Sequence, residues 1–129
     1  RGQMGEISFR RASYVVAEIE RVHLAMTALK NQDEQLLGNL LTQTHEGLST
    51  QYDVSCAELD FLQQSARKHQ DVLGARMMGG GFGGCTINLV KEDAIEELVK
   101  NIQPAYEQAM HLTLTSYIAS IENGTEIVR

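Results

Sequence analysis

Five glycines crowd into six positions of the stretch ARMMGGGFGGCTINLV, residues 75–90. They are Gly79, Gly80, Gly81, Gly83 and Gly84, interrupted only by Phe82. A glycine inside a helix or strand costs roughly 0.5–1 kcal/mol relative to alanine, because it loses more backbone freedom on folding. A bare backbone lets another main chain or a ligand approach closely, and successive free N–H groups attract anions. The run favours such a site over a plain hairpin turn, which one or two glycines would satisfy.

Two known phosphate-binding patterns share this spacing. Gly79, Gly81 and Gly84 match G-x-G-x-x-G, but the dinucleotide fingerprint needs a helix directly afterwards, and CTINLV is strand-like in composition. Protein kinases place the pattern between two strands. This chain has no V-A-I-K, H-R-D or D-F-G sequence and its first half is helical in pattern, so we set both alternatives aside.

Other residues that could do chemistry are dispersed. The histidines and cysteines have neither metal-ligand spacing nor a C-x-x-C pair; they are His23, His45, His69, His111, Cys56 and Cys85. We therefore expect no metal site and reduced thiols, as in a cytoplasmic protein. The net charge of −6 argues against nucleic acid or an anionic membrane as the main partner, and no apolar run is long enough to span a bilayer.

The elements that must position the glycines begin with three helices. Val15, Ile19 and Leu29 belong to one apolar stripe of a long amphipathic helix within residues 10–30, with Glu18, Glu20, Arg21 and Lys30 on the other face. Asp33 is the expected N-cap of a second helix. The sequence SCAE, residues 55–58, fits a capping box in which Ser55 and Glu58 start a third helix. Leu59, Leu62 and Ala66 of this helix would face the core.

Strand patterns appear on both sides of the glycines and again near the end of the chain. GARMM and CTINLV flank the glycine run, and a fourth helix is expected from about Glu92 with a bend or a restart at Pro104. Alternating residues 112–119 and the final TEIVR predict two more strands, joined by the turn dipeptide Asn123-Gly124. Helices followed by paired strands predict an α+β fold in one domain, residues 1–129, with helices on one face of an antiparallel sheet.

Three blocks of this sequence resemble one enzyme family. GARMMGGGFGG resembles the third conserved motif of the GHMP small-molecule kinases, in the form found in galactokinases. YDVSCAELD, residues 52–60, and RRASYVVAEIERV, residues 10–22, resemble stretches that precede this motif in the same order. Met78 stands where the family usually has Thr or Ser, and Ala57 stands where it often has Pro.

The resemblance implies a ferredoxin-like C-terminal domain of a two-domain sugar kinase that is inactive alone. The whole enzyme would transfer the ATP γ-phosphoryl group to a sugar hydroxyl with Mg²⁺, and galactose is the leading sugar, with N-acetylgalactosamine or a uronic acid as alternatives. The N-terminal domain would carry the phosphate loop, the catalytic Asp and most sugar contacts. Gly79 to Gly84 would lie against that domain, with Phe82 either fixing the loop or acting as an ordinary core aromatic. The alternative is a non-catalytic sensor or binding module built on the same fold.

No residue of this chain is assigned a catalytic role or a metal. Asp53, Glu58 and Asp60 are carboxylates close together in sequence, but their place at a helix start favours a structural role. Tyr52 and Cys56 are expected to pack. Because the chain starts with Arg1 rather than methionine, we expect it to be part of a longer protein.

Overall fold

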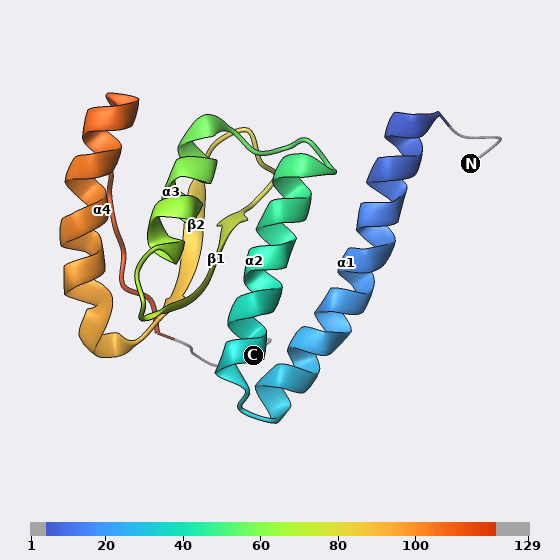
Figure 1. Ribbon diagram of the computed structural model, residues 1–129, viewed down its shortest axis with the longest axis horizontal. Helices are drawn as coiled ribbons and strands as arrows, with labels where there is room; N and C mark the ends of the chain where they lie inside the picture. The colour runs from blue at the N-terminus through green and yellow to red at the C-terminus, as the bar shows by residue number, and fades with distance from the viewer. Residues whose placement is uncertain (1–4, 121–129) are drawn as a thin grey trace, which may run out of the picture.

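The computed structural model describes residues 5–120 of the chain, and its elements follow the order expected up to the fourth helix. Three helices lead into an antiparallel hairpin, and a short 3₁₀ turn precedes the last helix (Figure 1). The elements are α1 (Glu6–Lys30), α2 (Glu34–Thr50), α3 (Ala57–Arg67), β1 (Val72–Met78), β2 (Cys85–Val90), η1 (Glu92–Ala94) and α4 (Ile95–Met110). The α+β prediction is confirmed.

Local sequence accounts for the start of α2 but not for the start of α3. Asp33 caps α2 as predicted, because its carboxylate accepts a hydrogen bond from the N–H of Leu36 at 2.9 Å. The predicted capping box at the start of α3 is wrong. Cys56 is the N-cap residue, and the Ser55 hydroxyl instead donates to Asp60 at 2.6 Å. Glu58 does reach back, since its own N–H and the Cys56 thiol lower the pKa of its carboxyl group.

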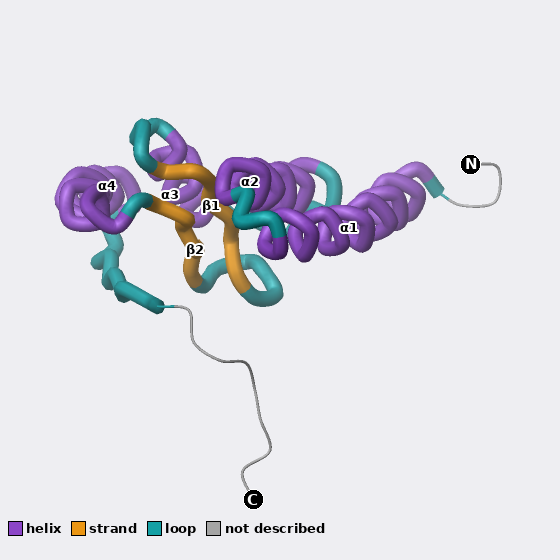
Figure 2. The backbone as a smooth tube through the Cα atoms, turned by 90° about the horizontal axis from the view of Figure 1, so that it is seen from below, coloured by secondary structure: helices purple, strands orange, loops and turns teal. Residues whose placement is uncertain are grey.

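The hairpin and two helices form the centre of the molecule. β1 pairs with β2, and α2 and α3 cover one side of the pair (Figure 2). Leu59, Leu62 and Ala66 of α3 are buried as expected, together with Ala75 and Met77 of β1. Gly38 of α2 lies directly against the backbone of Leu73 and Gly74, where a Cβ atom on either glycine would collide with the other element. This close approach of α2 places it tightly along β1.

The first helix packs differently from the prediction. Tyr14, Glu18, Arg21, Ala25 and Ala28 follow one another at helical spacing and are its buried or half-buried residues, whereas the apolar stripe beside them is exposed. In that stripe Val15, Ile19, Val22, Met26 and Leu29 are each 41–58% exposed. Glu18 and Arg21 were expected on the outer face, but they form an ion pair beside α2. The helix therefore leaves its most apolar side uncovered by the described residues.

The last part of the described chain also differs. Residues 113–120 form neither helix nor strand, so the strand predicted for 112–119 is wrong. The N–H of Leu114 donates to the Glu107 side chain of α4 rather than to a strand, and Tyr117 is 88% exposed. Alternation gives a strand only where a sheet edge receives it. The turn at Asn123-Gly124 and the strand TEIVR lie outside the described residues. The fourth helix continues through Pro104 without restarting there.

Candidate functional site

The glycine run forms the loop between β1 and β2, as predicted, and most of it has a backbone that disfavours side chains. The φ angles of Gly79, Gly81, Gly83 and Gly84 are 82°, 88°, 142° and 105°. Phe82 also has a positive φ of 60°, which is uncommon for a residue other than glycine. Four of the five glycines are thus required by backbone conformation alone.

Gly81 has a second, structural reason to lack a side chain. A Cβ atom there would collide with the carbonyl oxygen of Val54, in the connection between α2 and α3. The same oxygen accepts a hydrogen bond from the N–H of Phe82 at 2.7 Å. The tip of the loop is therefore anchored to the α2–α3 connection through its backbone.

Gly80 is different, because neither crowding nor its φ angle requires glycine. A Cβ atom on Gly80 would meet nothing within 4 Å, and Gly80 is absent from the glycines with positive φ. Gly79 and Gly83 also face open space. Among the described residues, no acceptor binds the N–H groups of Gly79, Gly80 or Gly83. The loop thus presents uncrowded backbone donors that could bind an anion.

Phe82 does not act as a core aromatic. Its side chain is 75% exposed, and Met78, the last residue of β1, is 40% exposed. The loop is fixed by the Phe82 backbone, not by its ring. Both apolar side chains are free to contact another surface.

Charged groups lie next to the loop's anchor. Asp53, which immediately precedes Val54, forms an ion pair with Arg10 at 2.5 Å and lies 4.0 Å from Arg11. All three side chains are about half exposed. The start of α1 is therefore held beside the α2–α3 connection by its arginines, and this end of α1 lies at the same end of the molecule as the loop between β1 and β2 (Figure 1).

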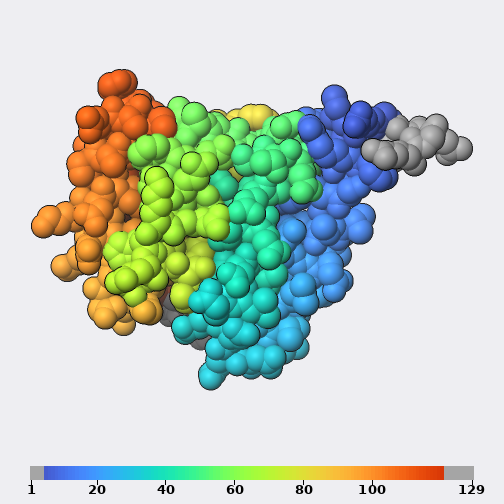
Figure 3. Space-filling view, in the orientation of Figure 1, coloured from blue at the N-terminus to red at the C-terminus, as the bar shows by residue number. Residues whose placement is uncertain are grey.

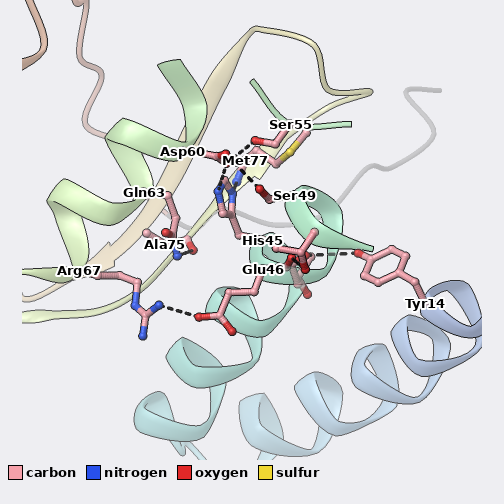
Figure 4. Close-up of polar contacts among 12 residues, drawn as sticks. Tyr14, His45, Glu46, Ser49, Ser55, Asp60, Gln63, Arg67, Ala75 and Met77 are labelled. Atoms are coloured by element: carbon pink, nitrogen blue, oxygen red, sulfur yellow. Dashed lines mark hydrogen bonds and ion pairs between the residues drawn. The ribbon is translucent and has the colours of Figure 1, made fainter. Parts of the chain in front are cut away.

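Sequence reasoning missed one buried polar cluster. His45 is 3% exposed and bonds to both Asp60 and the N–H of Met77, near the end of β1 (Figure 4). His45 and Asp60 lie fifteen positions apart and on different helices, so no sequence motif joins them. Asp60 was expected to be structural, and in this cluster it accepts hydrogen bonds from within the domain.

The remaining candidates give no further site. Among residues 5–120, no group of three or more His, Cys, Asp or Glu side chains is arranged to hold a metal ion. Cys56 and Cys85 are both free thiols. No helix in this part of the chain has the length and hydropathy needed to cross a membrane.

Comparison with known proteins defines the class. The profile of the family described as GHMP kinases C terminal matches residues 25–108, so the chain belongs to this family. The resemblance to the C-terminal part of galactokinases is also confirmed. A galactokinase from Clostridium perfringens is 44% identical over 115 residues, and the human galactokinase is 39% identical over 120. These matches cover 89% and 93% of this chain but 30% of each relative.

Solved structures agree with the sequence comparison. The galactokinase of Lactococcus lactis, solved with galactose, superimposes with a TM-score of 0.82 at 36% identity, over 86% of this chain and 29% of that one. The mevalonate kinase of L. major, solved with R-mevalonate, gives a TM-score of 0.58 at 33% identity, over 70% and 26%. The chain thus spans about a third of the length of the kinases that it matches.

Proposed function

We propose that residues 1–129 form a single domain, the C-terminal domain of a two-domain galactokinase-like kinase. The whole enzyme would transfer the γ-phosphoryl group of ATP to galactose, and this chain alone would be inactive. The observation that carries the proposal is the loop at residues 79–84. Glycine occupies position 80 of this loop although neither the φ angle nor crowding within the domain requires it there. The galactokinase relatives, which are about three times longer, supply the chemical class.

The loop's role follows from the demands of phosphoryl transfer. This reaction depends mainly on positioning the reactants and on stabilising the charge of the transferred group. Backbone N–H groups meet both demands, since they donate to anionic oxygens without ordering a side chain. We infer that Gly79, Gly80, Gly81, Gly83 and Gly84 approach the phosphate and sugar, with Phe82 contacting the facing domain.

The other components of the reaction are proposed to come from the N-terminal domain. This chain lacks a phosphate-loop sequence of the P-x-G-L-S-S-S-A type, so ATP and Mg²⁺ would bind mainly outside it. ATP supplies the phosphoryl group, and this domain would close one side of the site. The free thiols fit a cytoplasmic location.

Gly80 gives the test that best separates function from folding. Gly80→Ala adds a methyl group into open space with no positive φ to strain, so the stability of the full-length protein should stay within about 0.5 kcal/mol. If a ligand or domain occupies that space, the methyl group displaces it, and kcat/KM should fall on the order of tenfold or more. ADP release with galactose and MgATP measures the rate, and urea unfolding measures stability.

Gly5→Ala is the matched control, because a Cβ atom on Gly5 also meets nothing within 4 Å, outside the loop. Its kinetics should equal those of the unmodified enzyme. Unchanged kinetics for Gly80→Ala would mean that the loop is only a structural turn and contradict the proposed contact at Gly80. No ADP release by the unmodified full-length protein would favour the non-catalytic sensor.

A further inference from the structure

The outer edge of β1 is closed by side chains rather than by a strand. Within the described residues β1 pairs only with β2, on one edge. Along the other edge, Gln63 of α3 donates to the carbonyl oxygen of Ala75 at 3.3 Å, and His45 of α2 accepts from the N–H of Met77 at 3.0 Å (Figure 4). Gln63 and His45 are 2% and 3% exposed. Both backbone groups would otherwise be buried without partners, which costs about 1–3 kcal/mol each.

The two bonds of His45 fix its tautomer. The Met77 N–H can only donate, so Nδ1 must carry a lone pair. The proton of the neutral ring is then on Nε2, which lies 3.0 Å from Oδ1 of Asp60 and donates to it. The imidazole therefore links the backbone of β1 to a carboxylate on α3.

Asp60 connects His45 to the α2–α3 connection, which holds the tip of the glycine loop. Besides His45, its carboxylate accepts hydrogen bonds from Ser49 of α2 at 3.0 Å and from Ser55 at 2.6 Å. Ser55 directly follows Val54, whose carbonyl oxygen holds the N–H of Phe82. The Asp60 carboxylate therefore contacts both His45, which binds Met77 at the base of the loop, and Ser55, which is next to the residue that binds Phe82 at the tip.

We propose that His45 and Asp60 are positioning residues that set where the glycine loop lies during phosphoryl transfer. His45 fixes the base of the loop through Met77, two residues before Gly79, and Asp60 orients both His45 and the segment that holds the tip. These contacts add to the β1–β2 pairing of Met78 with Cys85 at the base of the loop, and among the described residues the N–H groups of Gly79, Gly80 and Gly83 have no acceptor. The proposal rests on the proposed function, because it concerns the geometry of that same site.

Two substitutions of His45 separate its two bonds. In His45→Asn the amide oxygen replaces Nδ1, so the acceptor for Met77 is kept and the donor to Asp60 is lost. In His45→Gln the amide nitrogen replaces Nε2, so the donor to Asp60 is kept and the acceptor for Met77 is lost. We expect His45→Gln to lower kcat of the full-length enzyme 10- to 100-fold, because small displacements of positioning groups cost about this much. The decrease in log kcat for His45→Asn should be no more than half of the decrease for His45→Gln.

Gln63→Met is the matched control, since it removes a bond of equal burial from the same strand edge, two residues farther from the loop. It should lower the unfolding midpoint as His45→Gln does and leave kcat within about twofold. Equal kcat losses for Gln63→Met and His45→Gln, or an unchanged kcat for His45→Gln, would reduce the pair to a stability role and overturn the proposal.

Hydrogen exchange gives a readout that does not need activity. In His45→Gln the amides of Met77 and Phe82, which are hydrogen-bonded at the base and the tip of the loop, should exchange at least tenfold faster, while amides in the middle of α3 keep their rates. Unchanged exchange at Met77 would overturn the proposed anchor even if the protein is a galactokinase. Faster exchange in a protein that releases no ADP would instead contradict the proposed function and leave the anchor established.

Discussion

Gly80 and Gly81 are neighbours in sequence, but the structure makes different demands on them. Gly81 has a φ angle of 88° and lies against the Val54 carbonyl, so the domain itself excludes a side chain there. Gly80 has neither constraint. The sequence alone does not distinguish these two glycines. The structure shows that folding requires glycine at position 81, whereas Gly80 is a candidate ligand contact.

A comparison of two loop glycines would measure the Val54 contact directly. Gly79 and Gly81 have similar φ angles, 82° and 88°, but only Gly81 is crowded. Gly79→Ala should therefore lower the free energy of unfolding by about 1 kcal/mol through backbone strain alone. Gly81→Ala should cost about 2–3 kcal/mol, because Val54 must also move and the bond to Phe82 weakens. Urea unfolding gives both values, and equal costs would show that the loop tip is not held against Val54.

At the scale of elements, Tyr14 is the aromatic residue through which α1 packs on α2. The Tyr14 ring lies on Gly47, where a Cβ atom would overlap it, and 5.5 Å from the ring of Tyr52. Its hydroxyl donates to the carbonyl oxygen of Thr44 at 3.4 Å. Burial, and then the nearby negative charge of Glu18, raise the pKa of Tyr14 to about 12, while Arg21 and Arg76 oppose the shift.

The raised pKa of Tyr14 predicts that the α1–α2 contact stabilises the folded domain less at alkaline pH. The pKa of Tyr14 is 10.0 unperturbed and about 12 in the folded domain, so the folded state keeps the proton longer as pH rises. The contribution is complete below pH 10 and is lost between about pH 10 and 12. The difference in unfolding free energy between the unmodified protein and Tyr14→Phe should therefore shrink over that window.

Urea unfolding at pH 8, 10 and 11.5 would measure this difference. Tyr106, whose pKa burial also raises, is present in both proteins, so its contribution cancels. A difference that stays constant with pH would mean that Tyr14 ionises as freely when folded as when unfolded.

The elements that could be predicted from sequence are those whose signals are local. The Asp33 cap of α2, the core-facing residues of α3 and the β-rich runs around the glycines depend on neighbouring residues, and each prediction is confirmed. Predictions failed where a partner decides the outcome. Ser55 bonds to a carboxylate instead of the helix end, and residues 112–119 have no strand partner among residues 5–120.

The candidate site shows the same division. The loop at residues 79–84 stands out in sequence because its composition is unusual, although its contacts stay a proposal. The His45–Asp60 pair could not be found, because its members come from two helices and meet a strand only after folding. A buried histidine in an amphipathic helix has no distinguishing pattern in sequence.

At the scale of the whole molecule, the outer side of α1 is an apolar surface that the described residues leave exposed. Figure 3 shows α1 as one flank of the molecule, in contact with α2 and with no further element beyond it. Its exposed apolar side chains are Val15, Val16, Ile19, Val22, Met26 and Leu29, between 41% and 69% exposed. Contiguous apolar surface of this kind marks an interaction site. Since this chain spans about 30% of its galactokinase relatives, we propose that the N-terminal domain covers this flank.

Substitution at the centre of this flank tests the docking. Ile19 is 58% exposed in this domain, so Ile19→Gln changes little unless another domain buries it. In the full-length protein, we expect Ile19→Gln to lower the free energy of unfolding by about 1.5–3 kcal/mol, the cost of losing a buried aliphatic side chain. Glu20→Gln, the next residue on the same helix and also exposed, is the matched control and should stay within about 0.5 kcal/mol. If Ile19→Gln is as neutral as Glu20→Gln, the flank remains open in the whole protein, and the N-terminal domain must dock elsewhere.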